Sequence, residues 1–258
     1  MDRTASRRPA SRLAVRALAL AALPVLLVTG CSSSSDSSDD ATQDNEPQSV
    51  APTPEPVRFE GLPEPCETIS QDTIGEVVPQ ADPEAGETLS SSDTATSAAC
   101  LWSGLDDFQF RSLTVALRRF DSDLSLGSGD ERATEYLQQM VDEVTGDDAN
   151  RDVESAELAE TGDAATSVAY SVTKTGDGED DEQDYRQQRV VSRVGNVVLT
   201  LDYSGAGFEG DDMPSADSVR EAAETAAREA AAAVDASADA TGGEAEEDAP
   251  AEDAPADE

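Results

Sequence analysis

The residues of this chain that could carry chemistry are its three cysteines and its many carboxylates, because the sequence has no histidine. Without histidine there is no His-based catalytic triad, no usual general base for neutral pH and little choice of transition-metal ligands. Aspartate and glutamate number 56, so the presence of two carboxylates, as a glycosidase needs, carries no information. We therefore expect no catalytic residue, no metal site and no cofactor. A hydrolase that uses carboxylates is the last-ranked alternative.

The first cysteine follows a signal-like segment. Residues 1–16 are basic, and the apolar run Ala17–Val28 would span roughly 18 Å as a helix, well short of the ~30 Å hydrocarbon core of a bilayer. This pattern is typical of a secretory signal. The next residues, "VTGC" ending at Cys31, resemble the lipobox of bacterial lipoproteins. The resemblance implies cleavage before Cys31 and diacylglyceryl attachment to its sulfur, because two or more acyl chains anchor a protein durably. An ordinary cleaved signal and a twin-arginine signal at Arg7-Arg8 remain open.

Composition divides the rest of the chain. The Ser/Asp/Pro-rich stretch after Cys31 and the acidic C-terminus hold too few bulky apolar residues to offset the chain entropy lost on folding, so both read as disordered. The expected organisation has four parts: a signal peptide at 1–30, a disordered tether at 31–58, one globular domain at 59–235 and a disordered acidic tail at 236–258.

The formal net charge of −39 limits the possible partners. Such a chain repels phosphate backbones, which excludes nucleic-acid binding. It also repels anionic lipid headgroups, so we expect membrane attachment through covalent lipid on Cys31. The remaining candidate partners are an envelope protein or a small ligand, bound by a monomer.

The other two cysteines, Cys66 and Cys100, lie in the part of the chain that would be exported, where thiols oxidise. We expect them to form a structural disulfide that closes a loop of about 35 residues, which stabilises by roughly 4 kcal/mol in the chain-entropy model. A redox-active pair is the alternative, but such pairs are usually spaced Cys-x-x-Cys. Trp102 is most simply a core residue that covers this disulfide, and a ligand contact is the alternative.

Hydrophobic periodicity predicts the elements that must position these residues. The pattern indicates an α+β domain: an antiparallel sheet with helices packed on one face. A tight turn at Gly195-Asn196 is typical of a β-hairpin. The expected helices cover 70–78, 130–144 and 214–236, and the expected strands cover 99–104, 108–120, 165–174 and two segments within 185–205.

Several short motifs together resemble a family of actinobacterial lipoproteins catalogued as domain of unknown function 3558. They are "LPEPCETIS" (62–70), "CLW" (100–102), the strand "SLTVAL" and the late hairpin "VGNVVLTLDYSG" (194–205), followed by an Ala-rich helix. The resemblance covers roughly residues 60–235. It implies this fold, the disulfide and a surface location, and it transfers no catalytic residue.

One acidic loop, "TGDGEDDEQD" at 175–184, is a candidate for calcium binding. Its carboxylates do not fit the calcium-loop register, because the sixth and twelfth positions counted from Asp177 are Glu182 and Gln188. A solvated hairpin loop is the simpler interpretation. The sequence therefore favours a lipid-anchored, extracytoplasmic, non-enzymatic module that binds a partner or ligand. A structural or accessory envelope protein is the alternative.

Overall fold

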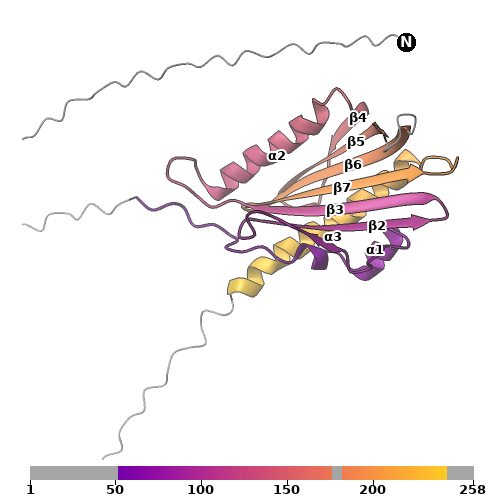
Figure 1. The fold of residues 1–258 in the computed structure, drawn as a ribbon. Helices are drawn as coiled ribbons and strands as arrows, with labels where there is room; N and C mark the ends of the chain where they lie inside the picture. Colours follow the sequence, from indigo (N-terminus) through magenta and orange to yellow (C-terminus); the bar gives the residue numbers. More distant parts are fainter. Residues whose placement is uncertain (1–51, 176–181, 243–258) are drawn as a thin grey trace, which may run out of the picture. The chain divides into compact units, whose positions relative to one another are not determined.

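The computed structural model describes residues 52–175 and 182–242. Within these ranges seven antiparallel strands form one sheet in the order β1-β2-β3-β7-β6-β5-β4 (Figure 1). The predicted α+β fold with an antiparallel sheet is confirmed. The strands are β1 (Glu87–Leu89), β2 (Ser97–Asp106), β3 (Gln109–Arg119), β4 (Arg151–Glu157), β5 (Ala164–Thr175), β6 (Glu182–Val194) and β7 (Val197–Gly207).

Two strands that the sequence pattern does not predict form the two edges of the sheet. β1 has only three residues, and β4, "RDVESAE", is almost entirely exposed and carries a register shift between Arg151 and Glu154. Neither strand shows apolar alternation, because an edge strand buries little of either side. Shortness, charge and an irregular register also keep an edge from pairing with another chain.

The helices lie on both faces of the sheet. The expected placement on one face holds for α1 (Gln71–Val77) and α3 (Ala216–Gly242), whereas α2 (Gly129–Thr145) packs against the opposite face. In Figure 1 α2 lies on the near side of the sheet and α3 runs behind it. We call the face under α1 and α3 the first face and the face under α2 the second face.

The first face holds the larger core. β3 and β7 contribute alternating Leu and Val side chains, and they meet a run of buried alanines on α3. Alanine lets the helix axis approach the sheet closely, since no long side chain separates the two. Tyr203 donates a hydrogen bond from its hydroxyl to the carbonyl oxygen of Val77, which ties the end of α1 to the sheet. The apolar residues buried here include Leu113, Val115, Leu117, Val190, Leu199, Leu201, Val219, Ala223, Ala227, Ala230 and Val234.

Of the three α-helices in the described ranges, α2 alone packs against the second face. α2 begins at a capping box in which Ser128 Oγ accepts from the Glu131 N–H while a carboxylate oxygen of Glu131 accepts from the Ser128 N–H, at 3.2 and 2.9 Å. Its apolar stripe buries Ala133 and Leu137 against Val191 and Val198 of the sheet.

The predicted turn at Gly195-Asn196 is present between β6 and β7, and Gly195 has a φ of +54°, the conformation that glycine favours at this position of a two-residue hairpin. Asn196 does more than turn the chain. Its fully buried side chain accepts from the Phe59 N–H and donates to the carbonyl oxygens of Phe59 and Phe120, each at 2.9 Å. One amide thus fastens the start of the domain and the end of β3 to the hairpin.

α3 continues to Gly242, beyond the expected end of the domain at residue 235. No helix within the described ranges is both long enough and apolar enough to cross a membrane.

Candidate functional site

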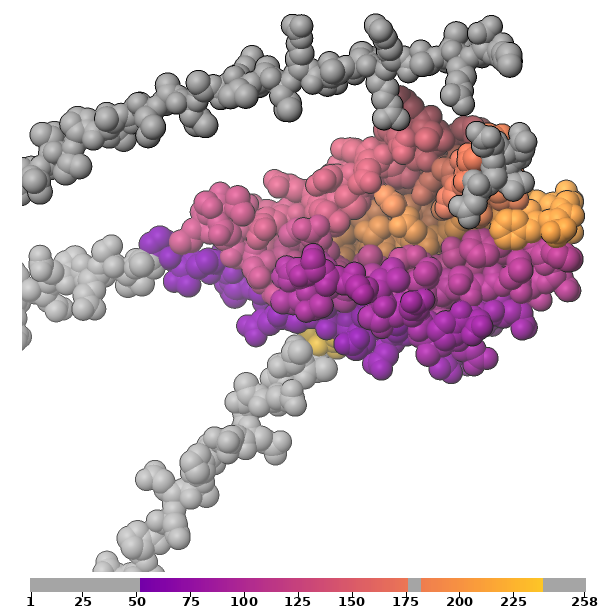
Figure 2. All heavy atoms as spheres, viewed as in Figure 1, coloured from indigo at the N-terminus to yellow at the C-terminus, as the bar shows by residue number. Residues whose placement is uncertain are grey.

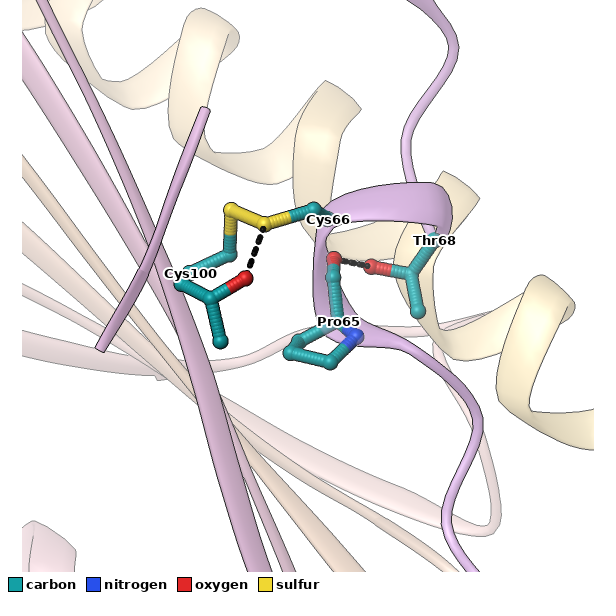
Figure 3. The surroundings of a disulfide bond; sticks show 5 residues. Pro65, Cys66, Thr68 and Cys100 are labelled. Carbon is teal, nitrogen blue, oxygen red and sulfur yellow. Dashed lines mark hydrogen bonds between the residues drawn. A yellow bond between two sulfur atoms is a disulfide. The ribbon is translucent and has the colours of Figure 1, made fainter. Parts of the chain in front are cut away.

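The two cysteines of the domain are bonded to each other. Cys66 lies in the short helix η1 (Pro65–Glu67) and Cys100 lies in the middle of β2, with their Cα atoms 5.2 Å apart (Figure 3). Thr68 donates a hydrogen bond to the Pro65 carbonyl oxygen at 2.8 Å, which holds the turn that presents Cys66. The predicted disulfide is therefore present, and it fixes the segment before α1 to the sheet.

Trp102 lies two residues after Cys100 on the same face of β2 and is only 1 % exposed. Its ring packs beside the disulfide under Gly86, where an added Cβ would stand 2.6 Å from Cys100 Sγ and from the indole ring. The ring belongs to the core, as the simpler interpretation has it, and a ligand at the surface does not reach it.

The predicted lipidation site and the acidic loop considered for calcium binding fall wholly or partly outside the described residues. Cys31 lies outside them, and so do Asp177, Glu179 and Asp181 of the acidic loop. Asp184 is described, and its carboxylate accepts from Thr173 Oγ1 at 2.6 Å and from Arg151 at 2.8 Å. These hydrogen bonds lower the pKa of Asp184, and the one from Thr173 has the larger effect. Within the described ranges no three His, Cys, Asp or Glu side chains gather as a metal site would require.

The second face of the sheet carries features that the sequence pattern does not single out. Because α2 crosses it obliquely, no other described helix covers the parts of this face on either side of α2. Figure 2 shows orange atoms of the β6–β7 region at the surface between α2 and the indigo-to-magenta atoms of the N-terminal half. Three hollows and an aromatic cluster occupy this open surface. One hollow, of about 400 Å³, follows the N-terminal half of α2 and is lined by Arg118, Phe120, Leu126, Arg132, Glu135, Tyr136 and Gln139.

The second hollow, of about 280 Å³, lies at the C-terminal end of α2. Arg189 and Asp202 pair across β6 and β7 on its floor through two hydrogen bonds of 2.7 and 3.1 Å. Burial, with a smaller contribution from the Asp202 carboxylate, raises the pKa of the neighbouring Tyr170 to about 12. Arg189 and Asp202 satisfy each other, and Glu143, Asp147 and Lys174 also line this hollow. Its remaining charged groups are therefore mostly acidic.

The third hollow, of about 430 Å³, lies between α2 and the β2–β3 hairpin. We call it the serine-rich groove. Its floor is a cross-strand row of small side chains, Ala99, Ala116 and Thr200, which are register partners on β2, β3 and β7. Arg118 and Tyr136 stand at its margin. The remaining lining residues are Leu89, Ser90, Ser91, Ser92, Ser97, Ala98 and Leu117.

An aromatic cluster lies at the end of the sheet near the β2–β3 turn. The rings of Phe110, Tyr185 and Phe208 have centroid separations of 5.8 to 6.4 Å. Beside them Leu105 and Phe108 are 54 % and 51 % exposed. Apolar side chains gathered at a surface in this way are a feature of interaction sites.

Sequence reasoning missed this surface because it followed the residues that point into the first face. In β3 the alternation of Leu113, Val115 and Leu117 predicts the core. The intervening residues Phe110, Ser112, Thr114 and Ala116 belong to the second face, as their register partners on β7 do. The one feature of the sequence that could have indicated this surface is Phe110, the aromatic residue among the β3 side chains of the second face.

A comparison of the sequence with models of known protein families finds no match. A comparison with curated proteins finds none either.

Proposed function

We propose that this chain is an exported lipoprotein, anchored by diacylglycerol on Cys31, whose domain binds a partner or ligand without catalysing a reaction. The anchor proposal is supported by cysteine pairing. The chain has three cysteines, and Cys66 and Cys100 are bonded to each other, so Cys31 has no cysteine partner within the chain. A disulfide also fits an oxidising compartment outside the cytoplasm.

The observation that carries the binding proposal is the partly uncovered second face of the sheet. A protein that acted only as a spacer would need only solvated charged side chains on this face. The face instead presents three hollows and exposed apolar side chains, the features by which binding surfaces are recognised.

The behaviour of the carboxyl groups supports binding over catalysis. An acid catalyst at neutral pH needs a raised pKa. Wherever a shift is resolved for a described carboxyl group, hydrogen bonds lower the pKa. Asp93, Asp123, Glu131, Asp184 and Glu229 behave in this way.

The anchor is tested by the intact mass of the protein from the membrane fraction. We expect wild-type chains to carry the mass of the lipid and to begin at Cys31, and we expect Cys31→Ala to leave the membrane fraction. An unmodified wild-type mass, together with Cys31→Ala that stays membrane-bound, would overturn the anchor.

The binding proposal is tested by site-specific photo-crosslinking on intact cells. A photoreactive amino acid at Phe108 should give a discrete adduct, because this side chain is exposed beside the aromatic cluster. The same amino acid at Glu221, an exposed position on α3, is the control and should give none. Equal adducts at both positions, or none at either, would favour the accessory envelope protein.

A further inference from the structure

The serine-rich groove differs in charge from the rest of the molecule. The chain carries 56 acidic residues against 17 basic ones, yet no carboxylate of a described residue lines the groove. Its polar groups are hydroxyls of serine, threonine and tyrosine and the single guanidinium of Arg118. The lining of this 430 Å³ hollow thus carries a guanidinium and no described carboxylate, although Asp93 follows Ser92 in the chain and Glu135 lines a neighbouring hollow together with Arg118.

Arg118 is held at the end of the groove floor. It follows Ala116 by two residues on β3, so its side chain lies on the same face, and Ser97 is its register partner on β2. Its guanidinium carbon lies 4.8 Å from the centre of the Tyr136 ring and 5.5 Å from that of Phe120. Such stacking fixes the plane of a guanidinium and leaves its N–H donors free to point elsewhere.

The guanidinium of Arg118 forms no ion pair or hydrogen bond with any described residue. The nearby carboxylate of Asp93 accepts within its own loop, from Thr96 Oγ1 at 2.6 Å and the Ala95 N–H at 3.2 Å. Arg118 also lowers the pKa of Asp93 through Coulombic attraction, but this is the smallest of the contributions, after the hydrogen bonds from Thr96 and Ala95. A planar guanidinium that rests on aromatic rings and has no hydrogen-bond or ion-pair partner among the described residues is suited to bind a carboxylate with two parallel hydrogen bonds.

The floor beside Arg118 is formed by small apolar side chains. Ala99 and Ala116 leave the space that a Leu or Val would fill, and Leu89 and Tyr136 form the walls. At roughly 30 Å³ for each water-sized group, the groove holds on the order of ten heavy atoms. The groove is therefore apolar along its floor and cationic at one end.

We propose that the serine-rich groove binds a small amphipathic carboxylate. The carboxylate pairs with Arg118 and accepts from the serine hydroxyls, and an apolar body of about eight carbons covers Ala99 and Ala116. This inference rests on the proposed binding function, because it names the class of ligand that the second face binds. It is independent of the anchor on Cys31 and of the aromatic cluster.

The test is a titration of the full ¹⁵N-labelled chain with octanoate and, separately, with octylammonium. Octanoate should shift the amide signals of Ala99, Ala116 and Arg118 saturably. Octylammonium should not, although an acidic chain attracts cations everywhere else. Arg118→Gln should weaken octanoate binding about tenfold or more, the order expected for the loss of a hydrogen bond to a charged group, and Ala116→Leu should abolish it by filling the floor.

Two matched variants serve as controls. Arg228→Gln removes an exposed guanidinium from α3, and Ala232→Leu enlarges an exposed alanine; both should bind octanoate as wild type does. Unsaturable shifts, equal shifts with octylammonium, or wild-type affinity in Arg118→Gln would each overturn the proposal. Because Arg118 is exposed, its replacement leaves the fold intact, so this outcome is decisive even if Ala116→Leu does not fold. Failure here leaves the mass and crosslinking tests of the proposed function unaffected.

Discussion

At Gly86 two requirements for glycine coincide. Its φ of +78° is one that other residues adopt only at a cost, and a Cβ there would stand 2.6 Å from both the disulfide sulfur of Cys100 and the ring of Trp102. We expect Gly86→Ala to lower the free energy of unfolding by about 2–4 kcal/mol, from backbone strain and overpacking together. Chemical denaturation measures this change.

Gly75 is the matched control. It lies inside α1 with nothing within 4 Å of an added Cβ. Gly75→Ala should therefore stabilise the domain by roughly 0.5–1 kcal/mol through helix propensity. A Gly86→Ala variant as stable as wild type would show that the disulfide and indole can move aside, contrary to the packing described.

Two tyrosines should make the domain sensitive to alkali. Burial raises the pKa values of Tyr170 and Tyr203 from 10.0 to about 12. Between these pH values the folded chain keeps protons that the unfolded chain has lost. Stability is therefore intact below pH 10 and falls as pH rises through about 12.

Absorbance titration of the phenolate and equilibrium unfolding at several alkaline pH values check this expectation. Tyr170→Phe should reduce the slope of stability against pH in the alkaline range, because one of the two late-titrating groups is gone. An unchanged slope in this variant would contradict the role of the Tyr170 hydroxyl. Tyr203→Phe is a less clean comparison, since it also removes the hydrogen bond to Val77.

At the scale of elements, α3 depends on small side chains. Ala227 is fully buried against the sheet, whereas Ala232, little more than one turn later, is exposed. We expect Ala227→Leu to destabilise the domain by about 1–3 kcal/mol, because the longer side chain pushes the helix off β6 and β7. Ala232→Leu should be within about 0.5 kcal/mol of wild type. Thermal unfolding of the two variants measures the difference, and similar losses in both would mean that helix propensity, not packing, dominates.

The elements that could be predicted from the sequence are those with one strongly apolar side. The helix at 130–144 and the hairpin around Gly195 show clear periodicity, and both are present. β1 and β4 were missed because edge strands bury too little to alternate. The face of the sheet against which α2 packs could also not be predicted from the sequence. Adjacent valines in β6, Val190 and Val191, point to opposite faces, so the sequence marks a strand buried on both sides without saying which helix covers which.

The candidate site was harder to predict for a related reason. The disulfide could be predicted because the expected domain contains two cysteines, and it is present. The serine-rich groove instead depends on residues that are small, Ala99 and Ala116, and a missing volume leaves no periodic signal. Arg118 lies near the end of a strand, as many surface arginines do. Only the pairing of Ala99 with Ala116 and of Ser97 with Arg118 across β2 and β3 brings the hollow and the charge together.

At the scale of the whole molecule, net charge outweighs the individual ion pairs. The pairs Arg58–Asp235 and Arg151–Asp184 are exposed at both ends, and pairs of this kind contribute little to stability because water and salt screen them. Even the better shielded Arg189–Asp202 pair neutralises only one acid. A chain with 56 acidic and 17 basic residues therefore retains a large repulsion that opposes compaction.

This balance predicts that salt stabilises the domain. Raising sodium chloride from about 0.01 to about 0.5 M shortens the Debye length from roughly 30 Å to a few ångströms, which screens the long-range repulsion while costing only the weak exposed pairs. We expect a gain of about 1–2 kcal/mol, or roughly 3–6 °C in melting temperature for a domain of this size. Potassium chloride should give the same rise, because screening depends on ionic strength and not on the cation. A melting temperature that falls with salt would mean that the ion pairs outweigh the repulsion, and a rise with one cation alone would point to specific binding by the carboxylates.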